Sequence, residues 1–279
     1  MCRGSGRHAY PQPGHVFRRE ASRFRGLPAQ RDTLRRVCRA SGIHARRQEQ
    51  CCRRSRGYPG PVRLDVFTQV PHAFAWLTEQ KPLATVLGRE LELRLFNYRA
   101  TTPLRAGQVD DEPYGGGAGM VLRVDVVAAA LDAAYGAERP ERVVALTPQG
   151  RQLDQSLVEE LAAAPSLAVL SSRFEGFDDR IVEHLCSDAI SIGPYVLSGG
   201  ELPAMVLLDA VARRLPGALA EGSGEHETFS SALEGGLEYP HFTRPADFRG
   251  WQVPAVLRSG DHARIDEWRL EQSRVRSMR

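Results

Sequence analysis

The alternation of short apolar segments with longer apolar helical patterns is the feature that most constrains the fold. Val62 to Thr68 shows it first, because β-branched and apolar residues alternate there with polar ones as in a strand. The expected strands are residues 62–68, 91–96, 142–146 and 167–170. The expected helices, from apolar residues at helical spacing, are residues 124–135, 153–164 and 202–215. Strands that alternate with helices predict an α/β domain, residues 62–220, built on a largely parallel sheet.

Residues 1–61 differ in composition from the rest of the chain. They hold 15 Arg and no Lys, but only Glu20, Asp32 and Glu49 as acids, and they lack periodicity. The alternatives are an Arg-rich arm that binds nucleic acid, a transit peptide, or a translated upstream stretch without a structural role. We favour the last and treat the segment as a disordered or non-native extension, because nothing in it offsets the conformational entropy lost on folding.

Cysteine content and hydropathy limit the kind of protein. Cys2, Cys38, Cys51 and Cys52 lie in the N-terminal extension, and Cys186 is alone in the remainder. This pattern predicts no disulfide framework and a reducing, cytoplasmic location. No apolar run approaches the roughly 18 to 20 residues that span a bilayer, so no membrane association is expected. No spacing of Cys or His predicts a metal site.

A short polar stretch separates the α/β domain from a different C-terminal region. Residues 221–227 have the composition of a linker. Residues 228–279 are expected to form a small, mostly helical domain in which Asp261 caps a helix. The expected inner face of that helix is Ile265, Trp268 and Val275. Arg outnumbers the acidic residues from residue 241 onward, which predicts either an RNA-binding surface or a solvated helix face.

Several loops that follow expected strands carry glycine or polar residues. In open α/β sheets, ligands bind at the carboxyl ends of the strands, so these loops are candidates for one shared pocket. The loops are residues 147–151, 172–176, 192–197 and 198–200. Gly199 and Gly200 allow the backbone to approach a ligand closely, and Pro203 is tolerated in the first turn of the following helix. The run matches neither a dinucleotide-binding motif nor a P-loop.

Two polar residues leave alternatives open. Glu175, between apolar residues and a glycine, is either an acceptor for a ligand hydroxyl or a partner in a buried ion pair. His241 is more often a structural histidine than a catalytic one in such a context. The order of Ser, His and Asp residues along the chain supports no hydrolase.

A series of motifs, in order, resembles the bacterial tRNA (guanine-N1)-methyltransferases that act on guanosine 37, a SPOUT-class family that uses S-adenosylmethionine. The motifs are Val109 to Met120, Thr147 to Arg151, Arg173 to Arg180, Ser191 to Arg213 and Glu238 to Pro245. The resemblance implies a trefoil-knotted parallel sheet with helices on both faces, a linker, and a small helical domain that binds tRNA. It also implies a homodimer whose active sites draw on both subunits, and a chain that begins with the strand at Val62.

The activity that the resemblance implies is methyl transfer from S-adenosylmethionine to N1 of guanosine 37 in tRNA. A carboxylate within hydrogen-bond reach can accept the N1 proton, and a guanidinium can stabilise the charge that develops on O6. The family's Asp-Ser-Phe motif corresponds to Glu227-Thr228-Phe229, so Glu227 takes the position of the general base with one additional methylene. Arg213 matches the family's catalytic arginine, and the alternative is a cation at a helix C-terminus.

The resemblance also implies a cofactor site. Its residues are Leu146, Pro148, Ser172, Glu175, Ile192, Gly193, Pro194, Tyr195, Val196, Leu197, Gly199 and Gly200. Ser172 stands where the family usually has Gly, Phe174 where it has Tyr, and Pro194, which lacks an N–H donor, where it has Asp. The alternatives to an active enzyme are a catalytically weakened RNA- and cofactor-binding relative, or a SPOUT methyltransferase with another RNA target. Family members are assisted by Mg²⁺, although the sequence offers no evident ligand set for it.

Overall fold

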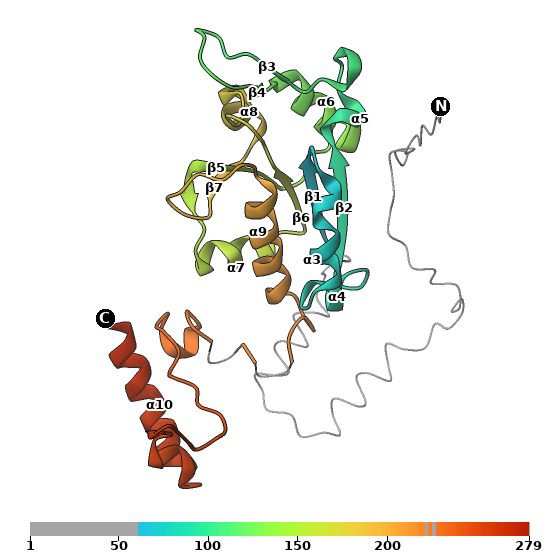
Figure 1. Cartoon of the computed structure of the whole chain (residues 1–279). Helices are drawn as coiled ribbons and strands as arrows, with labels where there is room; N and C mark the ends of the chain where they lie inside the picture. Colours follow the sequence, from blue (N-terminus) through green and yellow to red (C-terminus); the bar gives the residue numbers. More distant parts are fainter. Residues whose placement is uncertain (1–60, 221–222, 225–226, 279) are drawn as a thin grey trace, which may run out of the picture. The chain divides into compact units, whose positions relative to one another are not determined.

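The chain divides into two compact units that are described separately (Figure 1). The computed structural model describes residues 61–220, 223–224 and 227–278. The first unit, here the α/β unit, ends at Leu215, and the second, the C-terminal unit, begins at Pro216. The prediction for residues 1–61 lies, apart from Pro61, outside the described residues.

A five-stranded parallel sheet forms the centre of the α/β unit, which confirms the prediction of an α/β domain built on a parallel sheet (Figure 1). Its strands are β1 Val62–Thr68, β2 Leu91–Asn97, β5 Arg142–Gln152, β6 Ser166–Leu170 and β7 Asp188–Ser191. Their order across the sheet is β2-β1-β6-β5-β7, and every neighbouring pair is parallel. In β1 the register pairs Arg63 with Ser166 on one side and with Glu92 on the other.

The sequence prediction for β5 is too short. The apolar run ends at Leu146, but the strand continues past Pro148 to Gln152 and pairs again with β7. The reason is that residues 147–150 form an excursion, so that Leu146 and Arg151 both pair with Ile190. Proline and glycine within the excursion hide the continuation from a pattern-based prediction.

Helices connect the strands and cover them. The helices of this unit are α3 Ala75–Glu79, α4 Leu83–Val86, α5 Tyr98–Thr101, α6 Val124–Tyr135, α7 Gln155–Ala163, α8 Asp179–Leu185 and α9 Glu201–Arg214. Asp154 caps the start of α7, because its carboxylate accepts a hydrogen bond from the Leu157 N–H at 2.8 Å. A short antiparallel pair, β3 Asp110–Asp111 and β4 Val121–Leu122, frames the glycine-rich loop between them.

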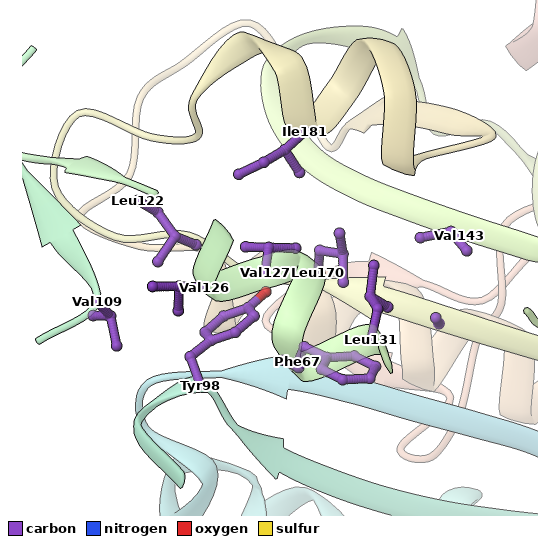
Figure 2. Close-up of a cluster of buried hydrophobic side chains, with 12 residues drawn as sticks. Phe67, Tyr98, Val109, Leu122, Val126, Val127, Leu131, Val143, Leu170 and Ile181 are labelled. Atoms are coloured by element: carbon purple, nitrogen blue, oxygen red, sulfur yellow. The ribbon is translucent and has the colours of Figure 1, made fainter. Parts of the chain in front are cut away.

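The core lies between the sheet and its helices. Figure 2 shows one cluster, in which Phe67 of β1 points toward Leu131 and Val127 of α6. Its labelled members are Phe67, Tyr98, Val109, Leu122, Val126, Val127, Leu131, Val143, Leu170 and Ile181. Successive side chains of a strand point to opposite faces, so Thr68, next to Phe67, points to the other side. Thr68 bonds to Glu201 of α9, so α6 and α9 cover opposite faces of the sheet.

The C-terminal unit has less regular structure. Its elements are the 3₁₀ turns η3 Ser231–Leu233 and η4 Ala255–Arg258, the hairpin β8 Asp247–Phe248 and β9 Trp251–Gln252, and helix α10 His262–Ser277. Asp261 caps α10 as predicted, since its carboxylate accepts from the Arg264 N–H. The predicted inner face is only partly right: Ile265 is buried, but Val275 is 43% exposed. Ser273 is buried instead, because its hydroxyl donates to the Leu237 carbonyl at 2.6 Å.

Candidate functional site

The carboxyl ends of the parallel strands bring the predicted loops to one edge of the sheet. Leu146 ends the first paired part of β5, Ser172 follows β6, and Ile192 follows β7. All these strands run in the same direction, so their following loops emerge on the same side. This is the edge at which an open α/β sheet offers a ligand site.

The loop after β6 and the start of α9 cross in direct backbone contact. The Gly200 N–H donates to the Ser172 carbonyl at 2.7 Å, and the Ser171 hydroxyl donates to the Gly200 carbonyl at 3.2 Å. A Cβ atom on Gly200 would come within 2.9 Å of the Ser171 Cα, so only glycine allows this approach. Ser172 is buried, and it takes part in this contact through its backbone carbonyl.

A buried carboxylate that sequence reasoning missed fastens this crossing. Glu201, the first residue of α9, is 6% exposed. Its Oε1 accepts from the Thr68 hydroxyl at 2.9 Å, and its Oε2 contacts Arg173 Nη1 at 3.3 Å. Three chain segments, the end of β1, the loop after β6 and the start of α9, therefore meet at one side chain. The available signal was an acidic residue in the first turn of an otherwise apolar helix.

The excursion of β5 forms a second tight crossing. Gly150 passes beside β7 so closely that an added Cβ would lie 2.4 Å from the Ile190 backbone nitrogen. Leu146, before the excursion, is buried, whereas Pro148 at its tip is exposed. The base of the loop is therefore fixed by packing, while its tip is accessible. A loop that contacts a ligand needs both properties.

Residues 192–197 form a compact loop after β7. The Ser191 hydroxyl donates to the Gly193 carbonyl at 3.0 Å, and the Tyr195 hydroxyl donates to the Ile192 carbonyl at 3.1 Å. The Tyr195 N–H also donates to the Gly193 carbonyl at 2.9 Å, which makes Pro194 the centre of a three-residue turn. Pro194, Tyr195 and Val196 are exposed, so this loop presents its side chains to solvent. Leu197 is half-buried.

The surroundings of Glu175 exclude one of its two predicted roles. Its side chain is exposed, so the buried ion pair is wrong, and the role of a ligand acceptor stays a prediction. It packs against Gly119, where a Cβ would come within 2.3 Å of Glu175 Oε1. The Glu175 N–H also donates to the Met120 carbonyl at 3.1 Å. The glycine-rich loop and the loop after β6 are thus held together at Glu175.

The two predicted catalytic residues lie in different units. Arg213 is half-buried in the last turn of α9. Asp209 lies one helical turn before it, and burial raises the pKa of Asp209 while the charge of Arg213 opposes that rise. Glu227 belongs to the C-terminal unit.

Backbone hydrogen bonds hold the segment around Glu227. The Ser230 N–H donates to the Glu227 carbonyl at 2.9 Å, and the Phe229 N–H donates to the Gly236 carbonyl at 2.8 Å. Phe229 has a φ of 68°, a left-handed conformation that is costly for an aromatic residue and is concentrated at functional sites. The Thr228 hydroxyl accepts from the Glu238 N–H at 3.1 Å. Glu227 therefore begins a turn whose backbone is held by these hydrogen bonds.

Among residues 61–220, 223–224 and 227–278, no group of three or more His, Cys, Asp or Glu is placed to hold a metal ion. None of the helices within these ranges has the length and apolar character to cross a membrane.

Comparison with known proteins places the motifs in one family. A model of the tRNA (Guanine-1)-methyltransferase TrmD family matches residues 62–279. A tRNA (guanine-N(1)-)-methyltransferase of Brevibacillus brevis is 46% identical over 214 residues, which are 76% of this chain and 86% of that protein. One of Dehalococcoides mccartyi is 43% identical over 221 residues, 78% of this chain and 88% of that protein. The resemblance of the motifs is confirmed, and the chain belongs to the tRNA (guanine-1)-methyltransferase family.

Proposed function

We propose that this protein transfers a methyl group from S-adenosylmethionine to N1 of guanosine 37 in tRNA. The observation that carries the proposal is the family match, which extends over residues 62–279 and includes both the sheet-edge loops and the turn at Glu227. Named relatives, such as the one from Brevibacillus brevis, are tRNA (guanine-N(1)-)-methyltransferases at 46% identity. A family of this kind needs a pocket for the methyl donor and a surface for tRNA.

The cofactor pocket is proposed at the carboxyl edge of the sheet. Its residues are Leu146, Pro148, Ser172, Glu175, Ile192, Gly193, Pro194, Tyr195, Val196, Leu197, Gly199 and Gly200. Two observations support the assignment: the loops emerge on one side of a parallel sheet, and their bases are locked by the contacts of Gly200 and Gly150. Rigid loops suit a donor whose methyl group must be aimed at one nitrogen.

The chemistry assigns one role to each predicted catalytic residue. The carboxylate of Glu227 accepts the proton of guanine N1, and the guanidinium of Arg213 stabilises the negative charge that develops on O6. S-adenosylmethionine supplies an electrophilic methyl carbon bonded to a sulfonium. The N1 lone pair forms the new C–N bond as the S–C bond breaks, and the sulfur becomes a neutral thioether.

Several further properties belong to the same proposal. The sheet is trefoil-knotted, as the resemblance to the family implies. Residues 221–227 link this domain to a helical, tRNA-binding domain, residues 228–279. The enzyme works as a homodimer in the cytoplasm. Mg²⁺ assists the reaction, as the resemblance to the family implies.

A methyl-transfer assay tests the proposal. Labelled S-adenosylmethionine is incubated with a tRNA transcript that has guanosine at position 37 and with one that has adenosine there, both with and without Mg²⁺. Label in the first transcript alone, at N1 of guanine after nuclease digestion, is the expected result. Label at another nucleotide would favour a different RNA target. Cofactor and tRNA binding without any transfer would favour a catalytically weakened relative. The departures from the family pattern at Glu227 and Pro194 are the reason to consider that alternative.

A further inference from the structure

The C-terminal unit contains a cleft that the proposed chemistry does not use. Its volume is about 240 Å³, and it lies between residues 239–242 and the first half of α10. Its walls include Tyr239, His241, Phe242, His262, Trp268 and Arg269. Buried Ile265 also lines it. We call this feature the aromatic cleft.

The rings of the aromatic cleft are arranged in pairs. Phe242 and Trp268 have ring centroids 6.4 Å apart, and Tyr239 and His241 have centroids 5.0 Å apart. The Arg269 guanidinium lies over the Tyr239 ring, 5.0 Å from its centroid. Aromatic faces and a stacked guanidinium form the surface on which unpaired RNA bases stack.

One wall offers a hydrogen-bond donor that the protein does not satisfy. Arg269 Nε is buried and has no hydrogen-bond partner, while its Nη1 contacts Asp266 at 3.3 Å. A buried donor without a partner is unfavourable, so a rotation of the Arg269 side chain that brings Nε to an acceptor on a ligand in the cleft is favoured. His241, on the opposite segment, is held by Glu238 at 2.7 Å, which fixes its ring in the wall. The edges of RNA bases carry many hydrogen-bond acceptors, which can supply the partner that Arg269 Nε does not find in the protein.

The size of the cleft limits its occupant. Pockets for drug-sized ligands measure roughly 300–1,000 Å³, and the aromatic cleft, at about 240 Å³, is smaller. It therefore suits a single planar ring system, with a sugar and phosphate left outside. An aromatic side chain from a second copy of this chain would also fit by size, but it would offer fewer acceptors to Arg269.

We propose that the aromatic cleft binds one unpaired base of the tRNA, outside the methylation site. The inference rests on the proposed function, because that function supplies the RNA. The cleft would raise tRNA affinity about 10-fold through one stacked base.

Tryptophan fluorescence tests this directly, because the chain has only three Trp. The variant Trp76→Phe/Trp251→Phe retains Trp268 as its reporter, and a tRNA transcript should quench it along the same titration curve that describes binding. The control Trp251→Phe/Trp268→Phe retains Trp76, in the other unit, and should not be quenched in this way. Quenching confined to Trp268 supports the proposal.

A second measurement uses the Arg269 donor. Arg269→Gln should weaken tRNA affinity about 10-fold in a filter-binding assay, in line with the loss of one stacked, hydrogen-bonded base. The matched control Arg274→Gln removes an exposed arginine from the same helix and should change affinity much less. Affinity for S-adenosylmethionine should stay the same in both variants.

Three outcomes would overturn the inference. Equal losses for Arg269→Gln and Arg274→Gln, without quenching of Trp268, would leave only unspecific attraction to phosphate. Trp268 fluorescence that changes with protein concentration in the absence of RNA would identify a second copy as the occupant. A wild-type protein that binds no tRNA would overturn the proposed function as well, whereas the first two outcomes leave that function standing.

Discussion

The two units hold their polar residues in opposite ways. In the α/β unit, the Glu201 carboxylate is buried and joins Thr68 and Arg173, so that residues far apart in sequence share one contact. In the C-terminal unit, residues 241–252 are all exposed, and local backbone hydrogen bonds such as that from the Val253 N–H to the Ala246 carbonyl hold them. Buried side-chain contacts hold the loops of the α/β unit in place, whereas residues 241–252 of the C-terminal unit are exposed to solvent.

Each unit therefore suits one of two requirements of the proposed reaction. A methyl donor must be held at a fixed distance and angle, which requires loops locked by buried contacts. A large RNA is bound over a wide surface, for which exposed aromatic and basic side chains on adaptable loops are suited. Changes in the locked loops of the α/β unit should therefore act on cofactor affinity and folding, and changes in the exposed loops of the C-terminal unit should act on tRNA affinity and turnover.

The largest effect is expected from Glu227→Gln in the C-terminal unit. Gln retains the shape of the side chain but cannot accept the N1 proton, so turnover should fall by about 10²-fold or more. Affinity for S-adenosylmethionine, measured by calorimetry, should stay nearly unchanged. Glu234→Gln, an exposed carboxylate of the same unit, serves as the control. Full turnover by Glu227→Gln would exclude this residue as the base.

Glu227→Asp refines the same comparison. A site adjusted to the longer side chain will be slower with Asp, and a site with the family's geometry will be faster. Single-turnover rates at saturating tRNA distinguish the two results, because they exclude differences in binding.

Gly199→Val tests the locked loops of the α/β unit. A Cβ at Gly199 would come within 2.5 Å of Glu201 Oε2, so the larger side chain displaces the buried carboxylate. Affinity for S-adenosylmethionine should fall by about 10-fold or more, equivalent to about 1.4 kcal/mol. Gly224→Val, where the added Cβ meets open space, is the matched control. Unchanged affinity in a folded Gly199→Val variant would place the cofactor elsewhere.

Thr68→Val should act on folding. It removes the hydroxyl that donates to Glu201 and that also accepts from the Val70 N–H at 3.0 Å. The free energy of unfolding should fall by about 1–3 kcal/mol, measured by urea denaturation. Thr78→Val breaks a solvent-exposed hydrogen bond and should change it by less than about 0.5 kcal/mol. Equal effects at both positions would mean that Glu201 does not fasten the loop crossing.

The smallest effect is expected from removal of residues 1–61. A chain that begins at Val62 retains β1 and the whole stretch that the family model matches. Its melting temperature and its turnover should equal those of the full chain. A loss of tRNA affinity on truncation would instead support the Arg-rich arm.

Local patterns determined which elements form. Alternation in residues 62–68 yields β1 with those bounds, and the periodicity of residues 124–135 yields α6, because side-chain spacing within one segment decides both. The motifs likewise placed the chain in its family, since their order is a property of the sequence alone. The site residues that were predicted from loops after strands lie at one edge for the same reason, once the sheet is parallel.

Contacts between distant segments were decided only by the tertiary structure. Nothing near Glu201 in sequence indicates that Thr68 and Arg173 would surround it, and the resumption of β5 after Pro148 depends on its pairing with β7. The burial of Ser273 in place of Val275 follows from the position of the Leu237 carbonyl, not from helical spacing. Periodicity reports which face of an element is apolar, whereas burial of a particular side chain depends on which segment packs against it.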